Sequence, residues 1–194
     1  MLKELILILM AGVLVNNYVL QQFLGICPFL GVSKKSDQAV GMGASVIFVM
    51  LVATAATWPI YNYLLVPNGL AYLQTIVFIL VIAALVQFVE IFLKKFIPAL
   101  HKSLGVYLPL ITTNCAILGV AILVIQKDYS LIESVVYALS TAIGFTLSLV
   151  LFAGIREQLS LNAIPKAMQG IPIALITAGL LAMAFMGFSG IKIC

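Results

Sequence analysis

Charged side chains are scarce in this sequence. Only 8% of its 194 residues are Asp, Glu, Lys or Arg, whereas 64% are hydrophobic, and the mean hydropathy is +1.24. Soluble domains carry about 25% charged residues, so the composition excludes a soluble globular domain. Too little polar sequence remains for an extramembrane domain, and we expect residues 1–194 to form one polytopic membrane domain.

Histidine and cysteine are also rare, with one histidine and three cysteines. An odd, small number of cysteines argues against a disulfide framework. Cys194 lacks the sequence context of the other two, so we expect an incidental thiol and assign it no role. We find no Walker loop, dinucleotide-binding fingerprint, hydrolase elbow or zinc-protease motif, so no complete active site is predicted on this chain alone.

The apolar residues form six long runs: 4–32, 39–65, 70–93, 103–125, 131–155 and 171–191. A helix needs about 20 apolar residues to cross a bilayer, and these continuous runs do not alternate as barrel strands do. The sequence therefore predicts an all-α membrane protein with six transmembrane helices.

The ten basic residues predict the orientation of these helices. Seven fall in the first, third and fifth loops and three in the termini and even loops. The seven are Lys34, Lys35, Lys94, Lys95, Lys102, Arg156 and Lys166. Because cytoplasmic loops are enriched in Lys and Arg, we expect both termini outside and read no nucleic-acid site in the net charge of +4. Three spans in each half would make residues 1–97 and 98–194 inverted repeats.

One phrase occurs in both halves. Cys27-Pro28-Phe29-Leu30-Gly31-Val32 returns 88 positions later as Cys115-Ala116-Ile117-Leu118-Gly119-Val120. Gly and Pro cluster at the first copy, and Pro109 and the polar run Thr112-Thr113-Asn114 precede the second. We therefore expect the first and fourth helices to be broken near their cysteines, which is tolerated at that depth only inside protein or beside a cavity.

The repeated cysteines allow three interpretations. They could be small buried hydrophobes, a disulfide pair, or ligands of a soft metal centre, above all an iron–sulfur cluster. A 2Fe-2S cluster needs four ligands, so the metal reading predicts that a partner built on the same plan supplies two more.

Five polar residues fall at membrane depth: Asn16, Asn17, Thr112, Thr113 and Asn114. They either line a path for ions or protons, or satisfy backbone groups opened by the helix breaks. The sequence leaves both readings open.

At these residues the sequence resembles a known family. Residues 13–17, 23–35, 108–116, 155–157 and 176–190 closely resemble the A subunit of the bacterial Rnf complex, and the likeness covers essentially the whole chain. The equivalent E subunit of the sodium-pumping NADH:quinone reductase is the alternative relative.

The resemblance implies a function that the composition does not. The Rnf complex passes electrons between ferredoxin and NAD and couples this flow to Na+ or H+ translocation across the bacterial inner membrane. In this family Cys27 and Cys115 match two ligands of an intramembrane 2Fe-2S cluster, which the homologous E subunit of the Rnf complex completes. The B, C, D and G subunits are the other implied partners.

Two further readings stay open. The chain would be an inverted-repeat secondary transporter or an assembly scaffold if its cysteines serve only packing. Iron in the purified subunits distinguishes an electron carrier from a transporter. The sequence does not reveal the ion, its binding residues, the cluster's potential or the direction of electron flow.

Overall fold

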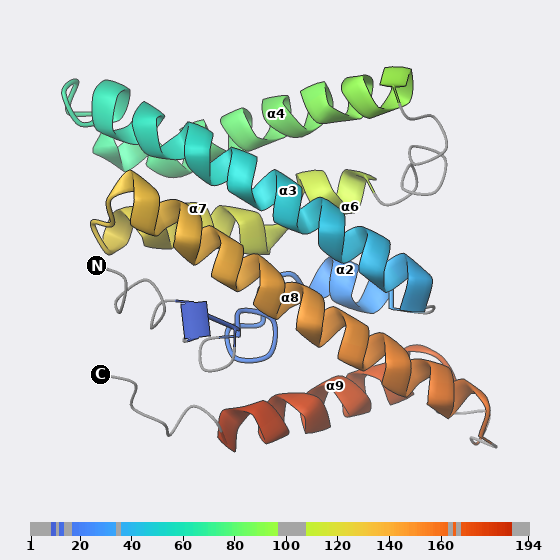
Figure 1. Cartoon of the computed structure of the whole chain (residues 1–194). Coiled ribbons are helices and arrows are strands. Elements are labelled where there is room, and N and C mark those ends of the chain that lie inside the picture. The colour runs from blue at the N-terminus through green and yellow to red at the C-terminus, as the bar shows by residue number, and fades with distance from the viewer. Residues whose placement is uncertain are drawn as a thin grey trace.

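A computed structural model describes residues 9–10, 12–13, 17–33, 36–96, 108–162, 165 and 168–187. These residues contain helices and turns and no strand, which confirms the all-α prediction for the part of the chain described. Figure 1 shows the helices stacked in layers, with α3 and α8 crossing the middle of the view. The α-helices are α2 (Ile26–Gly31), α3 (Ser36–Ile60), α4 (Gln74–Phe96), α6 (Leu108–Thr112), α7 (Cys115–Gln126), α8 (Leu131–Ser160) and α9 (Ile171–Met186).

Two short elements join α3 to α4. A π-helical turn, η2 (Tyr61–Leu65), extends α3, and a 3-10 turn, η3 (Ala71–Leu73), leads into α4. Pro59 lies just before η2.

Three helical segments are long and apolar enough to cross a membrane: Ser36–Leu65, Gln74–Ile91 and Leu131–Ser160. Leu110–Gln126 and Ile171–Met186 are shorter apolar segments. These five coincide with five of the predicted runs, whereas the first run, 4–32, is described only in part. The six-span count, the inverted repeat and the breaks within spans therefore stay predictions.

Two helices continue past the predicted ends of their apolar runs. Helix α4 extends beyond residue 93 through Lys94 and Lys95 to Phe96. The fifth apolar run ends at residue 155, yet α8 continues through Arg156 and Glu157 to Ser160. Charged residues end the apolar run but do not end the helix, because Arg and Glu are good helix formers. This extension places Arg156 on a helix rather than in a loop.

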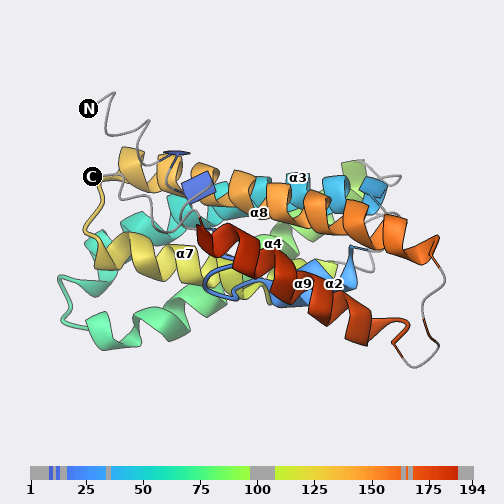
Figure 2. The ribbon, with the colours of Figure 1, turned by 90° about the horizontal axis from the view of Figure 1, so that it is seen from below.

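Helices α3 and α8 form the centre of the molecule and pack against one another along much of their length (Figures 1 and 2). Gly43 of α3 allows this approach, because a Cβ there would lie 2.4 Å from Cγ2 of Thr146 on α8. Hydroxyl groups on α8 are satisfied locally: Thr141 donates to the carbonyl of Tyr137 at 2.9 Å and Ser148 to that of Gly144 at 2.9 Å. Such bonds allow polar residues to occupy an apolar interior.

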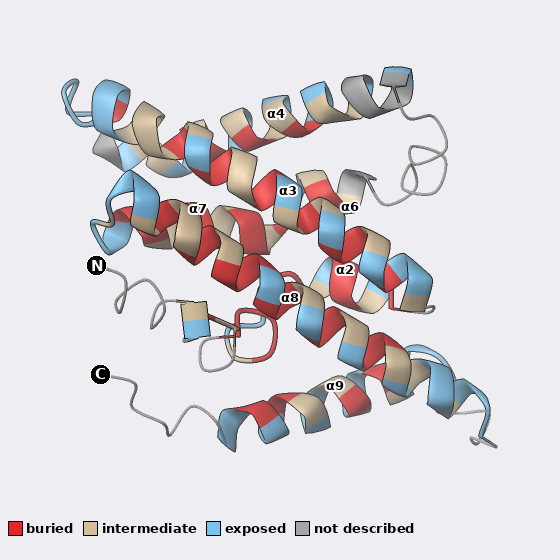
Figure 3. Cartoon of the chain, viewed as in Figure 1, coloured by how far each residue is buried: buried red, intermediate tan, exposed pale blue. Residues whose placement is uncertain are grey.

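The outer faces of α4 and α9 are apolar and exposed, whereas the buried residues gather between the central helices (Figure 3). Leu80 and Phe88 of α4 are 65% and 67% exposed, and Met183 of α9 is 62% exposed. Large exposed apolar faces are costly in water and suit contact with lipid. Burial thus agrees with a membrane location.

Candidate functional site where two helix starts meet

The repeated cysteines occupy matching places in the fold. Cys27 is the second residue of α2, and Cys115 is the first residue of α7. The segment that leads into α2 lies against the start of α7, where the backbone N–H of Gly25 donates a hydrogen bond to Sγ of Cys115 at 2.9 Å. The residues just before the first copy of the phrase therefore contact the first residue of the second copy.

Gly25 is required at this junction for two reasons. Its φ of +83° lies in the left-handed region, which other residues rarely adopt. A Cβ would also lie 2.8 Å from Cε2 of Phe145 and 3.2 Å from Cβ of Ala116. Only glycine brings the backbone this close to α7 and α8.

The fifth residue of each copy of the phrase is a glycine that faces the segment before the other cysteine. A Cβ on Gly119 of α7 would lie 2.8 Å from Cδ1 of Leu24, and one on Gly31 of α2 would lie 3.5 Å from Cδ1 of Leu110. Each glycine thus faces a leucine from the segment that precedes the other cysteine. At Gly119 this approach leaves no room for a Cβ, whereas at Gly31 a Cβ would make an ordinary van der Waals contact.

The two thiols differ in exposure. Cys27 is exposed, Cys115 is half-buried, and both are free. An exposed cysteine does not pack in a core, so the structure does not support the interpretation of Cys27 as a small buried hydrophobe. A thiol on the outside of the chain is available to a neighbouring protein.

Asn114 lies between the end of α6 and the start of α7. Its side chain caps α7, with Oδ1 accepting a hydrogen bond from the backbone N–H of Ala116 at 3.0 Å. The residue is 3% exposed, and its Nδ2 is buried without a hydrogen-bond partner in the structure. Of the two residues before Asn114, Thr112 is half-buried and Thr113 is exposed.

Asn17 lies in a different, complete network. Its Nδ2 donates to the carbonyl of Gly144 at 2.9 Å and to Oγ of Ser148 at 2.6 Å, and its Oδ1 accepts from the N–H groups of Val19 and Leu20. The side chain is fully buried. Asn17 thus anchors the segment before α2 to α8, while Asn16 lies outside the described residues. Neither residue's part in an ion path is tested by these contacts.

Arg156 makes contacts that were not predicted from the sequence. From α8, its Nη1 donates to the carbonyl of Leu30 at 2.9 Å and to Oγ of Ser33 at 2.7 Å. Leu30 lies in the last turn of α2, so Arg156 supplies a cation to the carbonyl end of the helix that carries Cys27. Phe152, one turn earlier on α8, stacks on Phe29 of α2 at 4.3 Å between ring centroids.

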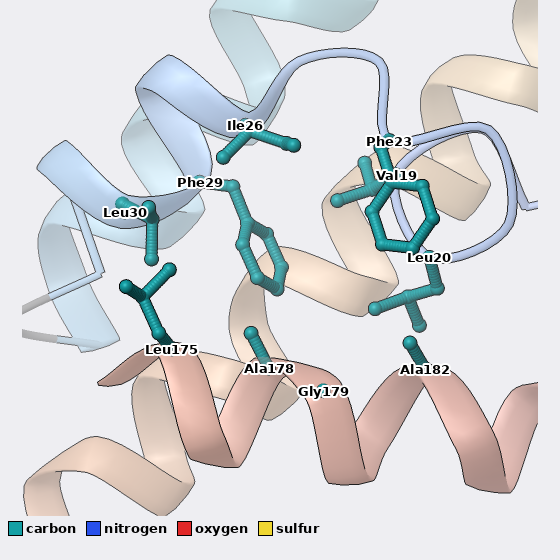
Figure 4. Close-up of a pocket in the computed structure, with 10 residues that line it drawn as sticks. All are labelled: Val19, Leu20, Phe23, Ile26, Phe29, Leu30, Leu175, Ala178, Gly179 and Ala182. Carbon is teal, nitrogen blue, oxygen red and sulfur yellow. The ribbon is translucent and has the colours of Figure 1, made fainter. Parts of the chain in front are cut away.

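An apolar cavity of about 160 Å3 lies between α2 and α9. Figure 4 shows Ile26, Phe29 and Leu30 of α2 on one side and Leu175 and Ala178 of α9 on the other. The lining side chains are all apolar, so they offer no side-chain ligand for an ion.

Few side chains at the junction could serve as metal ligands. Within the described ranges, no group of three or more His, Cys, Asp or Glu residues lies close enough to hold a metal ion. The chain brings two thiols to this region and, in those ranges, no third ligand of these types beside them.

These observations define an all-helical membrane protein in which the segment leading into one cysteine-bearing helix lies against the cysteine that begins another. The chain belongs to the family described as Rnf-Nqr subunit, membrane protein, whose model matches residues 5–192.

Its relatives are similar over almost their whole length. The chain is 59% identical to the A subunit of the Na(+)-translocating ferredoxin:NAD(+) oxidoreductase complex of Acetobacterium woodii, with 97% of this chain and 98% of the relative covered. It is 60% identical to the A subunit of the ion-translocating oxidoreductase complex of Syntrophotalea carbinolica, with 98% of each chain covered. The corresponding protein of an Azoarcus species is 55% identical, also with 98% of each covered. The predicted family is confirmed.

Proposed function

We propose that this chain is the A subunit of an Rnf-type ion-translocating oxidoreductase complex and carries electrons within the membrane. Cys27 and Cys115 supply two ligands of a 2Fe-2S cluster, and a homologous partner, the E subunit of the complex, supplies the other two. The functions named for the relatives support the complex, and the contact between Gly25 and Cys115 carries the assignment of the site.

The residues at the junction fit such a cluster. Thiolates are the usual ligands of iron–sulfur centres, and backbone N–H donors commonly hydrogen-bond their sulfurs. Gly25 already donates to Cys115, which is the first residue of α7, where the helix dipole favours negative charge. The exposed position of Cys27 allows a homologous partner to contribute its own pair.

The site's protein groups have distinct tasks in this mechanism. The bound cluster supplies one-electron chemistry. Gly25 and the capped start of α7 hold Cys115, and Arg156 together with the Phe29–Phe152 stack holds α2 and so Cys27.

Coupling follows from the cost of charge in a membrane. An added electron is expensive in low dielectric unless a cation approaches to compensate it. We propose that α6 and α7 are two halves of one broken span, that the segment before α2 is its counterpart in an inverted first half, and that these breaks control cation access. Na+ is named for the Acetobacterium relative, and Na+ or H+ is the cation here.

The proposal also sets the location and partners. The chain spans the bacterial inner membrane with both termini outside, in contact with the B, C, D and G subunits besides its homologous partner.

Electron paramagnetic resonance of the purified complex tests the site. Cys27→Ser and Cys115→Ser should each remove the 2Fe-2S signal and the ion uptake driven by electron transfer, while Cys194→Ser, the matched control, should retain both. A full signal in Cys27→Ser would show that the ligand assignment is wrong. A parent complex whose membrane subunits hold no iron would favour a transporter instead.

A further inference from the structure

Only one end of the Asn114 side-chain amide is hydrogen-bonded. Its Oδ1 is used in capping α7, but Nδ2, which carries two N–H donors, is buried and has no acceptor. Buried donors are nearly always paired, because an unpaired one keeps the full cost of losing water. An orphaned donor beside a candidate site therefore points to an acceptor that binds there.

The position of this amide relative to the cysteines follows from Gly25. Oδ1 of Asn114 lies 3.3 Å from the place where a Cβ of Gly25 would be, and the N–H of Gly25 bonds Sγ of Cys115. The Asn114 amide thus lies beside the residue that bonds the Cys115 thiol. Nδ2 belongs to that amide, so the unpaired donor lies at the junction itself.

A cap alone does not require asparagine. Ser and Asp cap helices about as well as Asn does, and neither brings an N–H donor into the protein. The amide donor is thus the part of Asn114 that capping leaves unexplained.

We propose that Asn114 sets the reduction potential of the site, its Nδ2–H donating a hydrogen bond to a sulfur of the bound 2Fe-2S cluster. This inference rests on the proposed function. Hydrogen bonds to the sulfurs of iron–sulfur centres stabilise the more negative, reduced state and raise the potential, most strongly where the dielectric is low. The added electron arrives from the preceding redox carrier of the complex and leaves to the next, and Asn114 keeps both amide protons throughout.

A redox titration of the purified complex, followed by electron paramagnetic resonance, tests this role. Asn114→Ser keeps a neutral cap oxygen and removes the amide donor, whereas Asn114→Ala removes both. We expect both variants to lower the equilibrium constant for reduction about tenfold, which is about 59 mV for a one-electron couple. Ser130→Ala, which removes the cap of α8, should leave the potential unchanged and controls for loss of a cap.

A second measurement locates the donor directly. In a complex labelled with asparagine carrying ¹⁵N in its side-chain amide, pulsed resonance of the reduced cluster should detect a weakly coupled ¹⁵N, and Asn114→Ser should abolish it. If Asn114→Ser fails to assemble, Asn114→Asp, an equally good cap, takes its place and should show an even lower potential because of its charge.

The outcomes separate this inference from the proposed function. A normal cluster signal whose potential and nitrogen coupling are unchanged in Asn114→Ser overturns the role of Asn114 and leaves the ligand assignment intact. Loss of ion uptake at an unchanged potential also overturns it and assigns Asn114 to the ion path. A parent complex with no cluster at Cys27 and Cys115 overturns both.

Discussion

Removing the Arg156 side chain should loosen the helix that carries Cys27. Arg156 donates to the carbonyl of Leu30 and to the hydroxyl of Ser33, which is fully buried. Hydrogen bonds to a charged group contribute about 1.5–3 kcal/mol each. Because Arg156 is only half-buried, solvent screening weakens each bond to about 1–2 kcal/mol, and the pair should contribute about 2–4 kcal/mol.

The expected shift in thermal stability follows from this magnitude. For domains of 150–250 residues, about 1 kcal/mol changes Tm by about 2–4 °C, so Arg156→Ala should lower the Tm of this chain in the purified complex by about 4–16 °C. Arg156→Lys keeps the charge but lacks the planar fork of donors, and its Tm should fall between those of Arg156→Ala and the parent. The iron content per complex should decrease in the same order.

Lys95→Ala is a suitable control. Lys95 is an exposed cation near the end of α4, and its removal should change Tm by little, because isolated surface charges contribute about 0–1 kcal/mol. Differential scanning fluorimetry and iron quantification on the same preparations give both quantities. If Arg156→Ala matched the parent in Tm and iron content, the bonds from α8 would not be what holds α2.

Two further substitutions probe the segment before α2. Gly25→Ala should destabilise the complex by about 2 kcal/mol or more, because it combines left-handed backbone strain of about 1–2 kcal/mol with crowding against α7 and α8. Gly69→Ala has the same backbone strain in open space, so an equal loss of Tm in the two variants would exclude a packing role for Gly25. Asn17→Ala should cost about 1–3 kcal/mol by leaving buried backbone donors unpaired, whereas Asn68→Ala, at an exposed site, should be near neutral in Tm. A stable Asn17→Ala complex that lost only ion uptake would instead place Asn17 on the ion path.

The sequence by itself determined the class of the protein and its candidate ligands. An 8% share of charged residues and long uninterrupted apolar runs leave helices in a membrane as the solution to backbone hydrogen bonding. The paired phrase at Cys27 and Cys115 identified both residues without any contact information. Two cysteines also implied a partner, since a cluster needs four ligands.

Only the tertiary structure decided which faces of the helices meet. Helices that are apolar all round have no single hydrophobic stripe, so their sequences do not indicate the buried side. The bonds of Arg156 to Leu30 and of Asn17 to Ser148 join residues 126 and 131 positions apart. The unpaired donor of Asn114 is likewise invisible in sequence, because satisfaction of a polar atom depends on every group packed around it.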